Sequence, residues 1–60
     1  MNGYELSLTM FTIDFFVSIN ERKVAEEYVE FLFFRLNIDR TLYKLLHEYL
    51  RIQFKNKEDK

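Results

Sequence analysis

The chain has no cysteine and a single histidine, His47, and this absence most constrains how its 60 residues can fold. A domain of this length buries only about 60% of the surface that its unfolded chain exposes. Such domains are usually stabilised by disulfides, a structural metal or a partner chain. Disulfides and thiolate metal sites need cysteine, and a multi-histidine zinc site needs more than one histidine. We therefore expect no metal or other cofactor, and stability from close packing or self-association.

The composition indicates one small folded domain over residues 1–60. Apolar residues make up 48% of the chain and aromatic residues 18%, with a net charge of -1. A disordered chain would have fewer aromatics and a higher net charge, and an electrostatically driven nucleic-acid binder would be clearly basic. The N-terminus lacks the basic region of a secretory signal, and no apolar run reaches the 18 residues of a membrane span. We expect a cytoplasmic protein without a membrane partner.

Residues 4–19 predict one long strand, because apolar and polar side chains alternate along them. The apolar positions are Tyr4, Leu6, Leu8 and Met10, followed by Phe11, Ile13, Phe15, Val17 and Ile19. A period of two is typical of a strand. The phase changes between Met10 and Phe11, as it does at a β-bulge. A tight hairpin is the alternative, although residues 8–12 contain no Gly, Asn, Asp or Pro for the turn.

Two helices are predicted after this strand, over residues 20–36 and 40–55, and residues 56–60 are expected to fray. Asn20 is a candidate N-cap for the first helix, and Ser18 with Glu21 is a competing capping box. Asn37 can end that helix in the left-handed conformation, and Asp39 can cap the next one. Each helix has an apolar arc of about 200°, wider than the usual stripe of about 100°. Such wide arcs need cover from outside one short chain.

These elements predict an α+β fold of β-α-α order in an intertwined homodimer. A lone strand leaves its backbone groups unpaired, and antiparallel pairing with its copy across a two-fold axis would satisfy them. A hairpin within one chain would make the dimer less necessary. The expected dimer interface comprises Phe11, Ile13, Phe15, Val17, Tyr28, Leu32, Leu46 and Tyr49.

The residues do not predict an enzyme. His47 falls on the outer face of the second predicted helix, and no nucleophile motif, phosphate loop or metal-ligand spacing accompanies it. We expect a small homodimeric protein that binds another macromolecule and modulates or inhibits it, as compact inhibitors from phages or mobile elements do. The expected partner is another protein. Its predicted partner-binding residues are two aromatic side chains on polar faces and an acidic helix face: Phe16, Phe34, Glu26, Glu27 and Glu30.

Residues 36–41, Leu-Asn-Ile-Asp-Arg-Thr, resemble the turn between the two helices of the ribbon-helix-helix family. The resemblance implies a DNA-binding transcription regulator as the alternative function. In that family, paired strands from two chains enter the major groove and the second helix begins at a phosphate. The resemblance would place base-reading side chains at Thr12, Asp14, Phe16 and Ser18. It would place phosphate contacts at Arg40 and Thr41, and the basic side chains of Lys44 and Arg51 could add to them.

Overall fold

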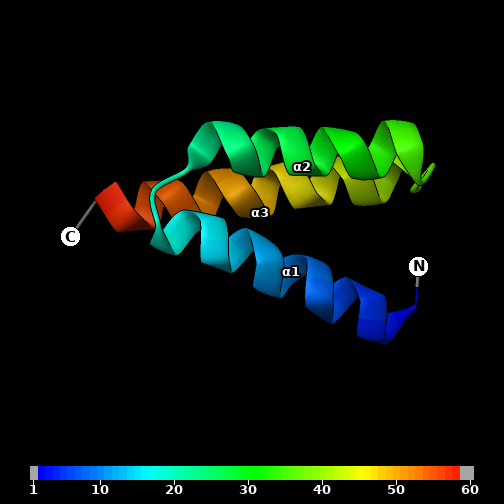
Figure 1. Cartoon of the computed structure of the whole chain (residues 1–60), viewed down its shortest axis with the longest axis horizontal. Coiled ribbons are helices and arrows are strands. Elements are labelled where there is room, and N and C mark those ends of the chain that lie inside the picture. Colours follow the sequence, from blue (N-terminus) through cyan, green and yellow to red (C-terminus); the bar gives the residue numbers. More distant parts are fainter. Residues whose placement is uncertain (1, 59–60) are drawn as a thin grey trace.

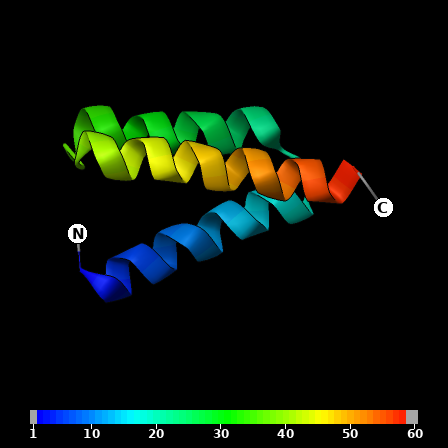
Figure 2. The same cartoon turned by 180° about the vertical axis from the view of Figure 1, so that it is seen from behind.

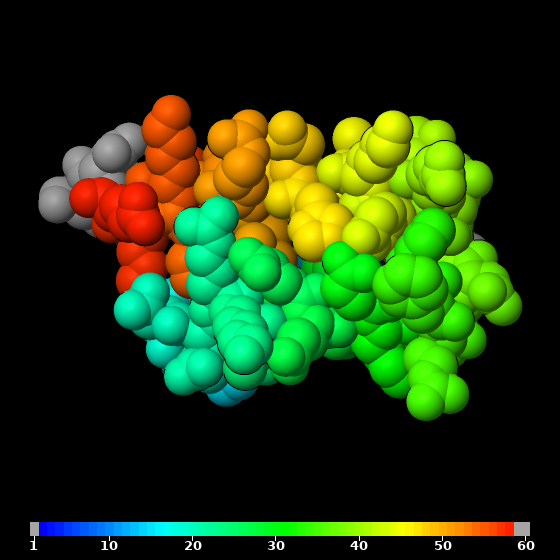
Figure 3. All heavy atoms as spheres, turned by 90° about the horizontal axis from the view of Figure 1, so that it is seen from above, coloured from blue at the N-terminus to red at the C-terminus, as the bar shows by residue number. Residues whose placement is uncertain are grey.

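The computed structural model describes residues 2–58, and this part of the chain forms three α-helices (Figure 1). Helix α1 spans Gly3–Ser18, α2 spans Arg22–Arg35 and α3 spans Arg40–Glu58. Helices α2 and α3 run antiparallel beside each other, and α1 packs against both (Figure 2). The N-terminal end of α1 diverges from the α2–α3 pair (Figure 1). Seen from above, α2 and α3 form nearly the whole visible face (Figure 3).

The predicted N-terminal strand is wrong, because Gly3–Ser18 is a continuous helix. No strand occurs between residues 2 and 58, so the bulge, the hairpin and the α+β assignment are wrong as well. The resemblance to the ribbon-helix-helix family does not hold either, since that fold requires a strand. A dimer joined through paired strands is excluded for the same reason, and two copies would need a different surface.

The side chain of Asn2 caps the first turn of helix α1, a role that the alternation of apolar and polar residues did not indicate. Asn2 is the N-cap, and its Oδ1 accepts a hydrogen bond from the Glu5 backbone N–H at 2.8 Å. Asn2 Nδ2 also donates to Glu5 Oε1 at 3.3 Å, a second hydrogen bond between the same two residues. The hydroxyls of Thr9 and Thr12 donate to carbonyls one turn earlier, at 2.9 and 2.8 Å, so these polar side chains are satisfied within the helix.

The chain leaves α1 through a left-handed residue, which makes the predicted N-cap role of Asn20 wrong. Asn20 has a φ of 60° and its N–H donates to the Val17 carbonyl, while the Glu21 N–H donates to the Phe16 carbonyl. These two bonds make a Schellman motif. The N-cap of α2 is Glu21 instead. The left-handed conformation predicted for Asn37 at the end of the next helix is confirmed, with a φ of 54°.

The core lies where all three helices meet, and each contributes to it. Its buried apolar side chains are Ile13, Ala25, Val29, Leu32, Leu46, Leu50 and Phe54. Helix α3 continues through Glu58, and Lys57 Nζ donates to the Val17 carbonyl at 2.6 Å at the end of α1. Residues 56–58 of the predicted frayed tail are therefore helical, and residues 59–60 lie outside the described part of the chain.

Candidate protein-docking surfaces

The outer face of α1 carries a row of exposed apolar side chains, here called the outer stripe. Its members are Tyr4, Leu8, Phe11, Phe15 and Ile19, exposed by 74, 49, 72, 54 and 47%. Steps of three and four residues place them on one side of the helix. Ile13, on the opposite side, is fully buried against α2 and α3. Helix α1 is therefore apolar on two opposite sides, and only one of them is covered within the chain.

The polar side chains beside the outer stripe are largely paired inside the protein. The Thr12 hydroxyl donates to the Leu8 carbonyl, and the Ser18 hydroxyl donates to the Phe15 carbonyl at 2.7 Å. Asp14 Oδ1 accepts a hydrogen bond from the Tyr49 hydroxyl at 2.5 Å. These pairings leave fewer groups that bind water around the stripe, which favours its burial by another molecule.

The bond between Asp14 and Tyr49 links α1 to α3 and changes the acidity of the phenol. The Asp14 carboxylate accepts this bond, which raises the pKa of Tyr49 to about 12. Burial of the phenol and the negative charge of Asp14 raise this pKa as well. A pKa raised in the folded state contributes stability that is present below the unfolded pKa of about 10. That contribution is lost as the pH rises through about 12.

An alkaline titration tests this contact between α1 and α3. We expect one of the four tyrosines of the wild-type chain to ionise near pH 12, and Asp14→Asn to return that ionisation toward 10. Tyrosinate absorbance measures both, with far-ultraviolet circular dichroism at each pH to confirm that the helices persist. Tyr49→Phe should remove the late step. Because the pKa of Tyr43 is raised as well, the comparison is made in a Tyr43→Phe background, where a late step that survives Tyr49→Phe would contradict the assignment.

A second apolar surface, here called the end patch, lies where α2 ends. It comprises Phe31 and Phe34, which are one helical turn apart and are 51 and 68% exposed. The Phe34 ring stands edge-on to Phe33 at 5.1 Å between centroids, and Phe33 stacks on Tyr43 of α3 at 4.3 Å. Half-buried aromatic rings therefore support the exposed ring of Phe34 from behind.

Glu30 connects α2 to α3 behind this patch. The Tyr43 hydroxyl donates to Glu30 Oε1 at 2.5 Å, and His47 Nε2 lies 3.1 Å from the same oxygen. The bond from Tyr43 lowers the pKa of Glu30, burial opposes this, and His47 adds to the lowering. The same bond raises the pKa of Tyr43. Glu30 therefore orders the aromatic stack and is engaged inside the protein.

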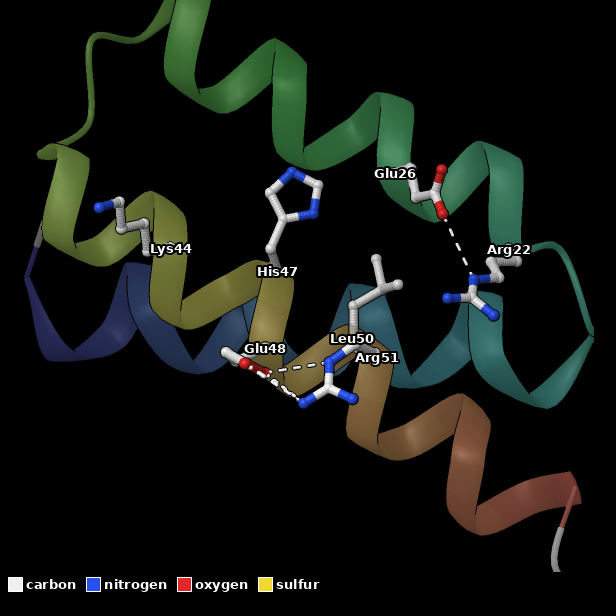
Figure 4. A pocket seen from close by; sticks show the side chains of 7 residues that line it. All are labelled: Arg22, Glu26, Lys44, His47, Glu48, Leu50 and Arg51. Atoms are coloured by element: carbon white, nitrogen blue, oxygen red, sulfur yellow. Dashed lines mark hydrogen bonds and ion pairs between the residues drawn. The ribbon is translucent and has the colours of Figure 1, made fainter.

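A shallow polar groove of about 450 Å³ runs between α2 and α3 (Figure 4). Arg22 pairs with Glu26 at 3.3 Å on one wall, and Arg51 pairs with Glu48 at 2.8 Å on the other. His47 points from α3 toward α2 between these pairs (Figure 4). Exposed ion pairs of this kind contribute little to stability. Lys44 also lines the groove, and no ion pair is found for it among residues 2–58. The groove therefore presents mixed charges, with one lysine unpaired within the described residues.

The predicted partner-binding residues do not form one face. Phe34 is exposed in the end patch, whereas Phe16 is half-buried and its ring meets Tyr28 edge-on at 5.9 Å. Glu30 faces α3, as its bonds to Tyr43 and His47 show, and Glu26 is paired with Arg22 within α2. Glu27 is exposed.

The predicted dimer-interface residues also lie in different parts of the molecule. Ile13, Leu32 and Leu46 lie in the core of the single chain. Val17, Tyr28 and Tyr49 are half-buried against that core, and Phe11 and Phe15 are exposed in the outer stripe. The predicted nucleic-acid contacts are all exposed on α3, with Arg51 paired to Glu48; they are Arg40, Thr41, Lys44 and Arg51.

Sequence reasoning gave Tyr4 and Leu8 no binding role, because it places them in a strand. Phe31 falls in the wide apolar arc predicted for residues 20–36, but it is not among the predicted partner-binding residues. The spacing 4, 8, 11 and 15 is the pattern that could have identified the outer stripe, since it follows one side of a helix.

No protein-family model, curated protein or solved structure matches this chain. None of the helices between residues 2 and 58 combines the length and the apolar character needed to cross a bilayer. Within the same residues, no three His, Asp or Glu side chains gather closely enough to hold a metal ion.

Proposed function

We propose that this chain is a small, non-catalytic interaction protein of the cytoplasm that forms a homodimer and binds and modulates another protein. The observation that carries the proposal is the exposure of apolar side chains. Among the described residues, eleven large hydrophobic side chains are 38–74% exposed. Monomeric soluble proteins rarely leave contiguous apolar patches of more than a few hundred Å² in water, and larger ones mark interaction sites.

The two surfaces lie on different helices, so two partners can be bound at once. We assign the other protein to the end patch because this surface has the features of a binding hot spot. An aromatic anchor, Phe34, stands on a supporting ring, Phe33, which the stack with Tyr43 holds in place. Anchors that are already ordered lose little side-chain entropy on binding, and aromatic residues dominate interface energetics.

Replacing Phe34 with serine tests this assignment. We expect Phe34→Ser to weaken binding to the partner protein at least tenfold, because an interface anchor contributes more than about 1.4 kcal/mol. The partner would be recovered by pull-down with the tagged full-length chain after cross-linking in the native host. Its affinity for each variant would then be measured with both proteins purified.

The matched control is Leu45→Ser, since Leu45 is 60% exposed, close to the 68% of Phe34, but lies on α3 outside the end patch. We expect this variant to bind as the wild type does. Equal affinities for wild type, Phe34→Ser and Leu45→Ser would contradict the assignment to the end patch. Failure to recover any protein other than the chain itself would contradict the proposed function.

A further inference from the structure

We infer that two copies of the chain pair through the outer stripe, with their α1 helices antiparallel. This inference rests on the homodimer of the proposed function and names the surface that forms it. The outer stripe is the side of α1 opposite the fully buried Ile13, so a second copy can reach it without disturbing the core.

The spacing of the stripe fits another helix. Tyr4, Leu8, Phe11 and Phe15 are separated by four, three and four residues, which is the a and d pattern of a coiled-coil heptad. Side chains at these positions make a narrow seam that stays aligned along a second helix of the same pattern. Among the helices of residues 2–58, α1 carries this exposed seam, so a second copy supplies a matching surface.

The exposed area reaches the lower limit for a specific pair if the whole stripe is buried. The exposed fractions of the five stripe residues add up to about three complete side chains. At roughly 150–250 Å² for an aromatic side chain, this is about 500 Å² per chain and about 1,000 Å² for two. That total reaches the threshold of about 1,000 Å² for specific protein interfaces.

The charges beside the stripe favour an antiparallel pair of chains. In the register that places Leu8 opposite the partner's Phe11, Glu5 lies near the partner's Thr12 and Asp14 lies near the partner's Ser7. No two like charges meet in this register. A parallel pair would bring the like ends of two helix dipoles together.

A lipid surface is the less suitable occupant. Helix α1 contains Glu5 and Asp14 but no lysine or arginine. Helices that lie on membranes usually carry Lys and Arg on their polar face to meet anionic headgroups. The charge of α1 would therefore be repelled by such a surface.

Sedimentation equilibrium of Phe11→Asp tests the pairing surface. We expect the wild type to be dimeric and Phe11→Asp to dimerise at least 100-fold more weakly, since it buries an unpaired charge in the seam. Phe34→Asp is the matched control, because Phe34 is also an exposed helical phenylalanine, at 68% against 72% for Phe11. This control should stay dimeric. Circular dichroism of each variant confirms that the helices are retained.

Disulfide trapping tests the orientation, and the absence of native cysteine leaves no background. We expect Leu8→Cys and Phe11→Cys chains, mixed under oxidising conditions, to form mainly the mixed disulfide. Dimers of like variants, Leu8→Cys with itself and Phe11→Cys with itself, would instead indicate a parallel pair and overturn the antiparallel arrangement.

The outcomes separate this inference from the proposed function. A Phe11→Asp chain that remains dimeric overturns pairing through the outer stripe and leaves the homodimer standing. A wild-type chain that is monomeric up to millimolar concentration overturns both. Flotation of the wild type, but not of Phe11→Asp, with vesicles of phosphatidylcholine and phosphatidylserine would assign the stripe to lipid and overturn the pairing.

Discussion

Replacing Ile13 with alanine is expected to remove most of the stability of the fold, whereas Phe11→Ala should leave the single chain almost unchanged. Ile13 is fully buried among core residues from α2 and α3, while Phe11 is 72% exposed. Removing a buried isoleucine side chain costs about 2–5 kcal/mol. A chain of this length has only about 3–5 kcal/mol of stability from its core, so the Ile13 variant should be largely unfolded at room temperature.

Urea denaturation followed by circular dichroism measures both variants. The protein should be dilute enough that the wild type is monomeric, so that Phe11 lies in water and its loss costs less than about 0.5 kcal/mol. The comparison also distinguishes the observed helix α1 from the strand that the alternation of apolar and polar residues predicts. A strand would place Phe11 and Ile13 on the same face, and equal losses of stability would contradict the helical arrangement.

Phe54→Ala is the second substitution with a large expected effect. The Phe54 ring is buried near the C-terminal end of α3, and the Arg22 guanidinium lies over it, 5.7 Å from its centroid. Its removal leaves a cavity and costs about 3–5 kcal/mol. In a small domain each kcal/mol corresponds to about 4–8 °C, so the Tm should fall by at least about 12 °C, and against about 3–5 kcal/mol of total stability this variant, like Ile13→Ala, should be largely unfolded at room temperature.

The control for Phe54→Ala is Ile52→Ala, two residues earlier and 45% exposed. We expect this change to lower the Tm by only a few degrees, because nearly half of the side chain already lies in water, whereas Phe54 is 3% exposed. Thermal unfolding of both variants at one protein concentration provides the comparison. Similar shifts for the two variants would show that the end of α3 does not pack on the core.

The error over residues 4–19 has a simple geometrical origin. Helix α1 carries two apolar stripes on opposite sides, one through positions 4, 8, 11 and 15 and the other through 6, 10, 13 and 17. Each stripe steps by four, three and four residues, and the two interleave to give an apolar residue at every second position. The step of three also produces the phase change between Met10 and Phe11 that resembles a β-bulge. A doubly apolar helix and a bulged strand therefore share one pattern.

The residues at the two ends of the first helix could have distinguished a helix from a strand. Asn2 and Glu5 have the spacing of a capping box, and Asn20 follows at a distance suited to a helix C-terminus. The second and third helices were predictable, over residues 20–36 and 40–55 against Arg22–Arg35 and Arg40–Glu58 in the structure. Their long amphipathic patterns and the break at Asn37 do not also fit a strand, as the pattern of residues 4–19 does.

The docking surfaces were harder to predict because they depend on contacts between distant residues. Glu30 looked like part of an acidic surface, but its partners Tyr43 and His47 lie 13 and 17 residues away. Asp14 meets Tyr49 across 35 residues. Which apolar residues stay exposed also depends on which side of each helix the other two cover, and periodicity within one segment cannot show that.

The doubly apolar character of α1 also matters while the chain is being synthesised. Helix α1 is made first, and Phe54, a core residue of α3, follows Ile13 by 41 residues. At about 5–20 residues per second, roughly 2–8 s pass before that part of the core exists. During this interval the inner side of α1 lacks the part of its cover that α3 supplies, so both sides of the helix expose apolar side chains. We expect the nascent chain to be most prone to aggregation before α3 is complete.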